Sequence, residues 1–409
     1  MKKPNKALNK TVRFILFAAA AVVLSFVYSH FSKKTEAIRV AYYGLPEPLV
    51  KNIRDWLNGR GVECTDFILD DSKPLRSQIK KTVQYDLLFI YDGANMDSVN
   101  TVVRNAETAA LQTLPLPVRI SVQTDGRLTG TPVLLDTFQL LYSQTALEAM
   151  NALPPSTLAR LENLAFNAKS ETSPLLCAGK DDNHLIMLFS SLLEAQEGIE
   201  LFDEALARLK ASKENDFAAF FAIGAVRDTV SRLALWQKYE LLPRNWLELT
   251  AESLASAAET EKVLIIFAPL SFYRNMEESR AHRYSLYFMP PNSLKAQRYI
   301  VSHTLAALQF SVPKSPLQTA AQATNKLAAG RALIRESVAA HSQTKLAAST
   351  RLLPSNSKAE TDGEAQRVLH ALSAADGIMP DIAQAAFTDA AQRKAFAEAL
   401  RKELQRAAQ

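Results

Sequence analysis

The sequence predicts an α/β protein with two lobes, each a sheet flanked by helices. Residues 37–91 alternate between strand-like and helix-like segments, an order typical of a parallel sheet with helices on its faces. The chain has 409 residues, more than one domain of roughly 100–200 residues accommodates. With 48% hydrophobic and 22% charged residues, it is too apolar to be disordered.

The first three strands and the helices between them follow residue 36. Apolar segments with β-branched and aromatic residues predict the strands, and apolar residues at helical spacing predict the helices. The expected strands are 37–43, 62–69 and 86–91, and the expected helices are 47–59 and 75–83.

Aromatic, small and acidic residues stand at the carboxyl ends of the first and third strands. Ligands of open α/β sheets bind outside these ends, where the strand order reverses. We therefore expect a ligand near Tyr42, Tyr43, Gly44, Tyr91 and Asp92. The same residue types are also typical of ordinary turns after strands, and both interpretations stay open at this point.

The rest of the body mixes extended and helical segments. Extended structure is predicted for 114–122 and 131–142, helices within 145–169 and 185–242, and further strands at 262–269 and 284–290. From Ser315 onward good helix formers predominate, with breaks at Pro354 and Pro380.

Basic residues are concentrated near the N-terminus. The first 34 residues hold seven Lys and Arg and no acidic residue, so the others carry 40 basic and 42 acidic residues, a net charge of −2. A protein that binds nucleic acid needs a basic face or stripe, and the basic residues of this body are interspersed with acidic ones. We therefore expect no nucleic-acid partner.

An apolar run between Phe14 and Phe31 has about the minimum length that spans a ~30 Å hydrocarbon core. The positive-inside rule then predicts a cytoplasmic flank over 1–13 and a transmembrane signal anchor over 14–32. This single-pass anchor would hold the body on the outer side of the cytoplasmic (inner) membrane, in the periplasm or exterior. A cleaved secretory signal is the alternative, and either interpretation exports the body.

The sequence contains no catalytic or metal-binding motif. It has no H-E-x-x-H, G-x-S-x-G or P-loop pattern, and its six histidines show no metal-ligand spacing. We expect neither an enzyme nor a bound cofactor. Cys64 and Cys177 could form a disulfide in an oxidising compartment, or they could be two separate thiols.

Six segments carry a family resemblance through their order and spacing. They are IRVAYYGLPEPLVKNIRDWLNGRGVECTDF, YDLLFIYDGAN, GTPVLLDTFQLLYSQTALEAM, KVLIIFAPLSFYRNME, YSLYFMPP and RLLPSNSKA. In this order they resemble the extracellular solute-binding proteins of family 1, the carbohydrate receptors of ABC importers that include maltose-binding protein. The resemblance spans roughly residues 37–400.

The resemblance implies a two-lobed fold of the periplasmic-binding-protein type II. Lobe 1 would comprise 37–137 plus 289–345, and lobe 2 would comprise 143–287 plus 346–409. Crossing strands near 136–142 and 284–291 would act as the hinge. The implied function is to capture a small solute, with a sugar as the first expectation, and to present it to ABC permease subunits.

The resemblance also implies solute contacts from lobe 2, at Asp182, His184, Phe272, Tyr273 and Arg274. Helix capping is the first explanation for the acids around Asp182, because acids at a helix start accept hydrogen bonds from free N–H groups. The family's aromatic residue after the strand is replaced here by Leu270. A second hypothesis is therefore an envelope scaffold or interaction protein that keeps the fold with a degenerate cleft.

Overall fold

The computed structural model describes residues 37–79, 85–169, 173–212, 216–258, 263–294, 298–311 and 320–409. The predicted signal anchor over 14–32 lies outside these ranges. Among the helices within them, none combines the length and the apolar character needed to cross a membrane.

One continuous sheet runs through the molecule, with the strand order β2-β1-β3-β10-β6-β8-β7. The first three strands, β1 (Ile38–Tyr43), β2 (Cys64–Leu69) and β3 (Leu87–Tyr91), are parallel, with β1 in the middle. Their register places Tyr43 beside Leu69 and Ile90. The predicted parallel sheet is thus confirmed, and the carboxyl ends of these strands lie at one edge.

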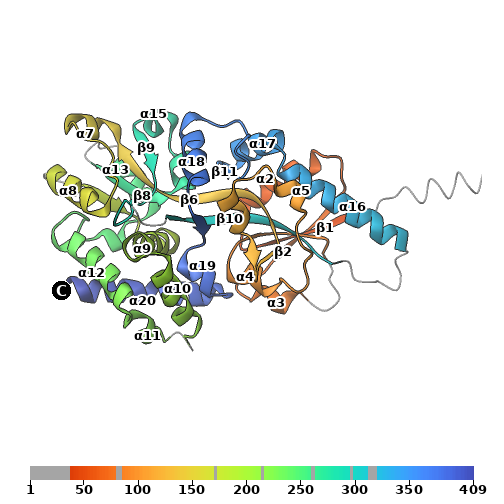
Figure 1. Cartoon of the computed structure of the whole chain (residues 1–409), viewed down its shortest axis with the longest axis horizontal. Coiled ribbons are helices and arrows are strands. Elements are labelled where there is room, and N and C mark those ends of the chain that lie inside the picture. Colours follow the sequence, from red (N-terminus) through yellow and green to blue (C-terminus); the bar gives the residue numbers. More distant parts are fainter. Residues whose placement is uncertain are drawn as a thin grey trace, which may run out of the picture.

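Two long strands connect the two parts of the sheet, as Figure 1 shows. The first half of β6 (Thr131–Ser143) pairs with β10 (Tyr299–Gln309) and β11 (Leu353–Pro354). Its second half pairs with β8 (Ile265–Pro269) and β9 (Tyr284–Tyr287). We call the part built on β2, β1 and β3 lobe 1, and the part built on β8, β9 and β7 (Leu175–Cys177) lobe 2.

Two predictions about strands were wrong. The strand expected to cross back was 284–290, but β9 pairs only with the lobe 2 half of β6. The crossing strand is β10, which pairs in turn with β12 (Gly377–Met379), β6 and β3. Residues 114–122 were expected to be extended, but Leu116–Ile120 form a helix, because Pro115 and Pro117 suit its first turn.

The helices cover both faces of the sheet. In chain order they are α2 (Glu47–Asn58), α3 (Leu75–Gln78), α4 (Ala94–Ser98), α5 (Thr108–Leu111), α6 (Leu116–Ile120), α7 (Gln144–Ala149), α8 (Leu158–Ala168), α9 (Asp182–Glu197), α10 (Ile199–Lys210), α11 (Ala218–Phe221), α12 (Gly224–Lys238), α13 (Ala251–Ala258), α14 (Leu270–Asn275), α15 (Glu278–Ala281), α16 (Ala320–Ser337), α17 (Ala340–Thr350), α18 (Gly363–Ser373), α19 (Ile382–Ala386) and α20 (Ala390–Ala408).

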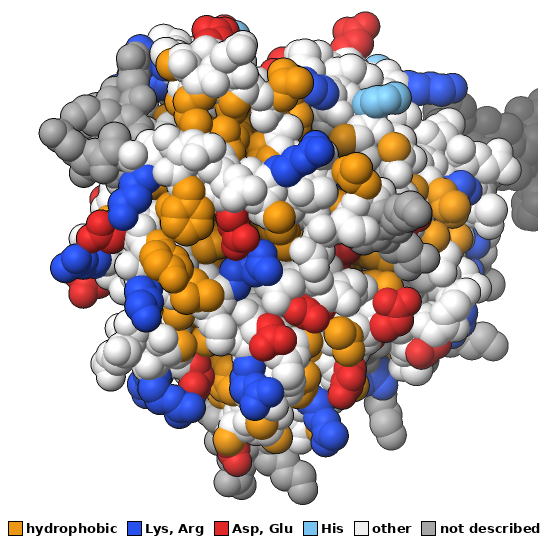
Figure 2. All heavy atoms as spheres, turned by 60° about the vertical axis from the view of Figure 1, so that its left-hand side comes forward, with side chains coloured by type: hydrophobic (Ala, Val, Ile, Leu, Met, Phe, Trp, Pro, Cys, Tyr) orange, Lys and Arg blue, Asp and Glu red, His pale blue; other side chains and the backbone are white. Residues whose placement is uncertain are grey.

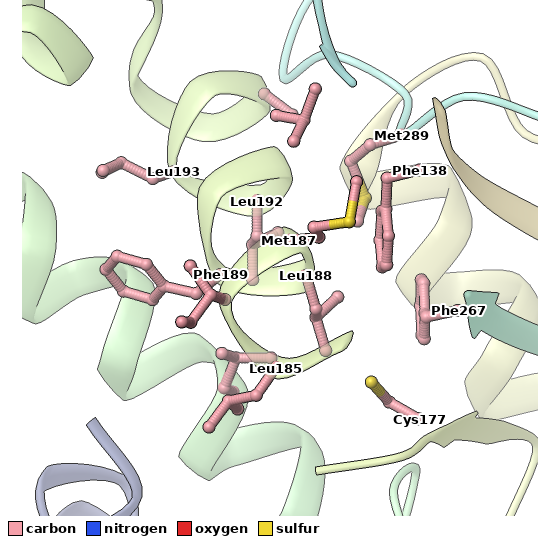
Figure 3. Close-up of a cluster of buried hydrophobic side chains, with 14 of the residues drawn as sticks. Phe138, Cys177, Leu185, Met187, Leu188, Phe189, Leu192, Leu193, Phe267 and Met289 are labelled. Atoms are coloured by element: carbon pink, nitrogen blue, oxygen red, sulfur yellow. The ribbon is translucent and has the colours of Figure 1, made fainter. Parts of the chain in front are cut away.

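The core of lobe 2 surrounds α9, which is apolar on nearly all sides. Figure 3 shows Met187 and Leu188 facing Phe138 of β6 and Phe267 of β8, while Phe189 points to the other side. A helix buried all round fits the weak amphipathicity of its sequence. Burial of each such side chain stabilises the folded state by about 1.5–3 kcal/mol. The helix α9 therefore contributes strongly to the stability of lobe 2.

The two cysteines do not pair. Cys177 is buried beside α9 and Cys64 is half-buried on β2, and both are free thiols. On the face of lobe 2 that Figure 2 shows, basic and acidic side chains alternate and form no region of a single sign.

Candidate functional site

A small cavity lies between the lobes at the carboxyl ends of β1 and β3. Its volume is about 100 Å³. Lobe 1 contributes Tyr43, Gly44, Asp71, Tyr91 and Asn95. The C-terminal segment, whose helices α19 and α20 pack on α9 of lobe 2, contributes Gln384, Asp389 and Arg393. We call it the interlobe cavity. In Figure 1 it corresponds to the region below the crossing strands, where α4 approaches α19.

The backbone of the two lobes meets directly at Gly93, where α4 begins. Gly93 has a φ of 104°, and a Cβ atom there would lie 2.4 Å from the carbonyl oxygen of Gln384. The Gln384 side chain donates a hydrogen bond of 2.9 Å to the carbonyl oxygen of Asp92. Only glycine permits both the positive φ and this approach. The two lobes are therefore in direct contact beside the interlobe cavity.

A buried ion network joins the crossing strand β10 to the C-terminal helices. The Asp381 carboxylate lies 2.5 Å from His303 Nε2 and 3.2 Å from Arg393 Nη2. Burial alone would raise the pKa of Asp381, but Arg393 and His303 outweigh it and lower that pKa to about 2. Arg393 also donates to Asn183 at 3.2 Å and to Gln384. We call Asp381, His303 and Arg393 the latch.

Aromatic rings and a carboxylate gather at the centre of the two lobes. The rings of Tyr91 and His303 are 5.5 Å apart, and those of His184 and Phe272 are 5.9 Å apart in an edge-to-face arrangement. Asp136, on β6, accepts hydrogen bonds from the Ser271 amide and hydroxyl at 2.9 and 2.7 Å. Burial raises the pKa of Asp136, against the opposing effect of these bonds.

His184 has no hydrogen-bond partner on either ring nitrogen among the described residues. Its Nδ1 lies 3.1 Å from Asp181 Oδ1, but this pair lacks hydrogen-bond geometry. Asp181 instead accepts from the amides of Asn183 and His184 as the N-cap of α9. The capping interpretation is confirmed for Asp181, and it does not extend to the buried ring of His184.

The amide and the side chain of Asp92 both bind the backbone of Thr304 on β10. Its amide donates to the carbonyl oxygen of Thr304, and its Oδ1 accepts from the Thr304 amide, each at 2.9 Å. Burial raises the pKa of Asp92 well above its usual range, and Oδ2 has no partner within the described chain. Asp92 thus fastens the end of β3 to β10 behind the cavity.

The other predicted residues are distributed over three environments. Tyr42 lies in the core of lobe 1, stacked on Phe89, with its hydroxyl donating to Asp66 at 3.2 Å. Asp182 is half-buried, and its Oδ1 lies 2.5 Å from Arg401 Nη2. Of the residues predicted at the strand ends, Tyr43, Gly44 and Tyr91 line the interlobe cavity.

Tyr273 and Arg274 line a different and larger cavity, of about 870 Å³. It lies on the opposite side of the crossing strands, near α15, β11 and α18 (Figure 1). Arg274 forms an ion pair with Asp362 and donates to the carbonyl oxygen of Leu352 at 3.1 Å. Arg351 donates to the carbonyl oxygen of Arg274 at 2.7 Å. We call this cavity the hinge-side groove.

Sequence reasoning missed the C-terminal half of the site. Asp381, Gln384, Asp389 and Arg393 follow Pro380, a region whose composition indicated only helices. His303 was missed together with the strand that carries it. The one available signal was the pair Asp381 and Asp389, which precede α19 and α20 as N-caps.

The fold is similar to that of solved solute receptors. No protein-family model and no curated protein matches the sequence. The bacterial solute receptor AcbH, described as having an exclusive preference for β-D-galactopyranose, matches with a TM-score of 0.70 and 12% identity over 91% of this chain and 98% of that chain. A probable secreted solute-binding lipoprotein from Streptomyces coelicolor matches with a TM-score of 0.64 and 13% identity over 92% and 99%.

A third structure, the binding protein RafE in complex with raffinose, matches with a TM-score of 0.59 and 11% identity over 91% of this chain and all of that chain. Identities this low establish the fold alone. The predicted two-lobed solute-binding-protein fold is thereby confirmed.

Proposed function

We propose that the chain is an extracytoplasmic solute-binding protein of an ABC importer and that it binds a carbohydrate in the interlobe cavity. The observation that carries this proposal is the position of the cavity. It lies at the carboxyl ends of β1 and β3, between lobes joined by β6 and β10. Ligands of α/β sheets bind at such ends, and crossing strands allow hinge closure over them.

The lining of the cavity suits a sugar. Tyr43 and Tyr91 offer aromatic surface, and Asn95, Gln384 and Asp389 offer donors and acceptors for hydroxyl groups. A volume of about 100 Å³ is below the roughly 300–1,000 Å³ of ordinary ligand pockets. We therefore expect the lobes to open about β6 and β10 when the solute enters, and the latch to break and re-form.

Delivery to a permease and attachment to the inner membrane belong to the same proposal. Both rest on the sequence, since the expected anchor over 14–32 precedes the described residues. Membrane fractionation of the full chain, compared with a variant carrying Lys or Arg within the apolar run, tests the attachment. Retention of that variant in the membrane fraction would contradict it.

The test of solute binding is thermal unfolding of the full chain against a panel of mono- and oligosaccharides. A solute that binds only the folded state stabilises it by about 2.7 kcal/mol at a concentration 100 times its Kd. Tyr91→Leu should weaken binding about tenfold, or ~1.4 kcal/mol, while the control Tyr239→Leu changes an exposed tyrosine of lobe 2 and should not. No stabilisation by any sugar would refute the proposal.

The alternative is a scaffold with a degenerate cleft, and the direct contact between Gly93 and Gln384 favours it. A scaffold would stay closed, whereas a receptor samples an open form. Small-angle scattering and thermal unfolding, each with and without sugars, separate the two hypotheses. An unchanged radius of gyration, together with no sugar that stabilises the folded chain, supports the scaffold.

A further inference from the structure

We infer that the solute of the interlobe cavity carries a cationic amino group, as an amino sugar does. This inference rests on the proposed function and names the substrate class more narrowly. It is based on the two carboxylates that line the cavity and on the ion pair between its arginine, Arg393, and Asp381.

Two carboxylates face the cavity from opposite lobes, Asp71 after β2 and Asp389 before α20. No ion pair of Asp71 or Asp389 occurs within the described residues. The neighbouring Asp70 is 2.7 Å from Lys73, so that pair is internally neutral. The α20 dipole and the Ala391 amide, which donates to Asp389 Oδ1 at 2.8 Å, partly offset the charge of Asp389. Asp71 is exposed and accepts no such bond from the described residues.

The cation of the cavity lining does not balance these carboxylates. Arg393 lies 3.2 Å from the fully buried Asp381, and its other donors bind Gln384 and Asn183. Asp381 is ionised at neutral pH, because its pKa is about 2. Arg393 is thus paired with Asp381, and the formal charges of the exposed Asp71 and the half-buried Asp389 have no ion-pair partner within the described residues.

Tyr43 holds the two acidic segments together. Its hydroxyl lies 2.9 Å from the carbonyl oxygen of Lys73 and 3.3 Å from that of Thr388. These residues are close neighbours of Asp71 and Asp389 in the chain. Burial is the main reason why the pKa of Tyr43 is raised to about 12, and the nearby charges of Asp71 and Asp389 raise it further.

An ammonium group fits this environment better than a neutral or anionic group. Carboxylates on two sides pair with its charge, and the rings of Tyr43 and Tyr91 offer π-faces, which attract cations. Among the described residues no group of acidic, histidine and cysteine side chains could hold a metal ion. The amides of Asn95 and Gln384 remain for neutral hydroxyl groups.

The experiment measures Kd by calorimetry on the full chain for glucosamine, N-acetylglucosamine, glucose and putrescine at neutral pH. Glucosamine should bind at least tenfold more tightly than the two neutral sugars, and added salt should weaken it. Tight binding of putrescine alone would keep the amine chemistry and identify a simple amine rather than a sugar as the solute.

The variants Asp71→Asn and Asp389→Asn should each weaken glucosamine about tenfold and leave the neutral sugars unchanged. Asparagine keeps the N-cap of α20, so the second variant should fold. Asp55→Asn, which removes an exposed carboxylate of α2 away from the cavity, is the control and should have no effect.

Equal affinity for neutral sugars, or amine affinity that neither variant reduces, would overturn the inference and leave the proposed function standing. Absence of binding by every sugar and amine would overturn both.

Discussion

Gly93 shows how one residue can control the contact between the lobes. Its φ of 104° and the 2.4 Å approach of the Gln384 carbonyl oxygen to a hypothetical Cβ exclude any side chain. A side chain at this position would clash with the backbone of Gln384, and rotation of a side chain could not relieve that clash. The contact between the lobes therefore depends on glycine at this position.

We expect Gly93→Ala to push the lobes apart. The variant should lose about 1–3 kcal/mol of stability and show a larger radius of gyration in solution scattering. Gly126→Ala is the matched control, because Gly126 has a φ of 73° but open space around its Cβ position. If both variants lose the same stability and neither expands, the contact with Gln384 has no role in closure.

Glu194 on α9 predicts a pH dependence at the residue scale. Burial, opposed by the Tyr299 amide that donates to its Oε1 at 2.9 Å, raises the pKa of Glu194 from 4.5 to about 7. Between pH 4.5 and about 7 the Glu194 carboxyl loses its proton in the unfolded chain but keeps it in the folded chain. The free energy of unfolding therefore falls as pH rises through this range. The contribution over this window is roughly 3 kcal/mol.

Urea unfolding from pH 4.5 to 7 tests this effect. In Glu194→Gln the amide oxygen still accepts from Tyr299, and the decline of stability with pH should be reduced. Glu197→Gln, at the end of the same helix, should keep the wild-type slope. Identical slopes in all three proteins would contradict the assignment.

At the scale of elements, α9 carries the core of lobe 2. Leu188 is fully buried against β6 and β8, and its truncation leaves a cavity that close packing cannot fill. Leu188→Ala should therefore cost about 2–5 kcal/mol in denaturant unfolding. Leu201→Ala on α10, where the side chain is 38% exposed, should cost clearly less, and an equal loss would contradict the packing argument.

The strands show which elements local pattern can predict. β1, β2 and β3 are apolar runs closed by turn residues, and their positions were predicted correctly. β10 was missed because Ser302, His303 and Thr304 interrupt its apolar run. These polar residues are buried because β10 bonds on both sides and reaches β12, Asp92 and Asp381. Only partners distant in sequence explain them.

At the scale of the whole molecule, the latch holds the C-terminal segment against β10. Asp381 is 0% exposed. Its carboxylate caps α19 and also pairs with Arg393 and His303. Its folded pKa is depressed to about 2, so its stabilisation is present above the unfolded pKa near 3.8 and is lost as pH falls through 2.

We expect Asp381→Asn to cost about 3–5 kcal/mol at neutral pH, because it leaves buried charges unpaired. Asparagine keeps the cap. The control Asp362→Asn also changes a helix N-cap that pairs with an arginine, but Asp362 is 50% exposed and should cost about 0–1 kcal/mol. Equal urea midpoints for both variants would show that the latch does not stabilise the folded chain.

The candidate site was predictable only on its lobe 1 side. Tyr43, Gly44 and Tyr91 follow from the rule that ligands bind at the carboxyl ends of strands. Asp389 and Arg393 belong to the last helices, and the 3.3 Å contact between Tyr43 and Thr388 joins positions 345 residues apart. Such proximity leaves no local signature in the sequence.

The sequence by itself determined the fold class, because strand and helix periodicities are local properties of the chain. It also placed the end of the sheet where a ligand would bind. The tertiary structure decided which residues meet there. The contact at Gly93 and the pairing of Arg393 with Asp381 depend on distant segments packing together, and this packing determines which charged groups remain for a solute.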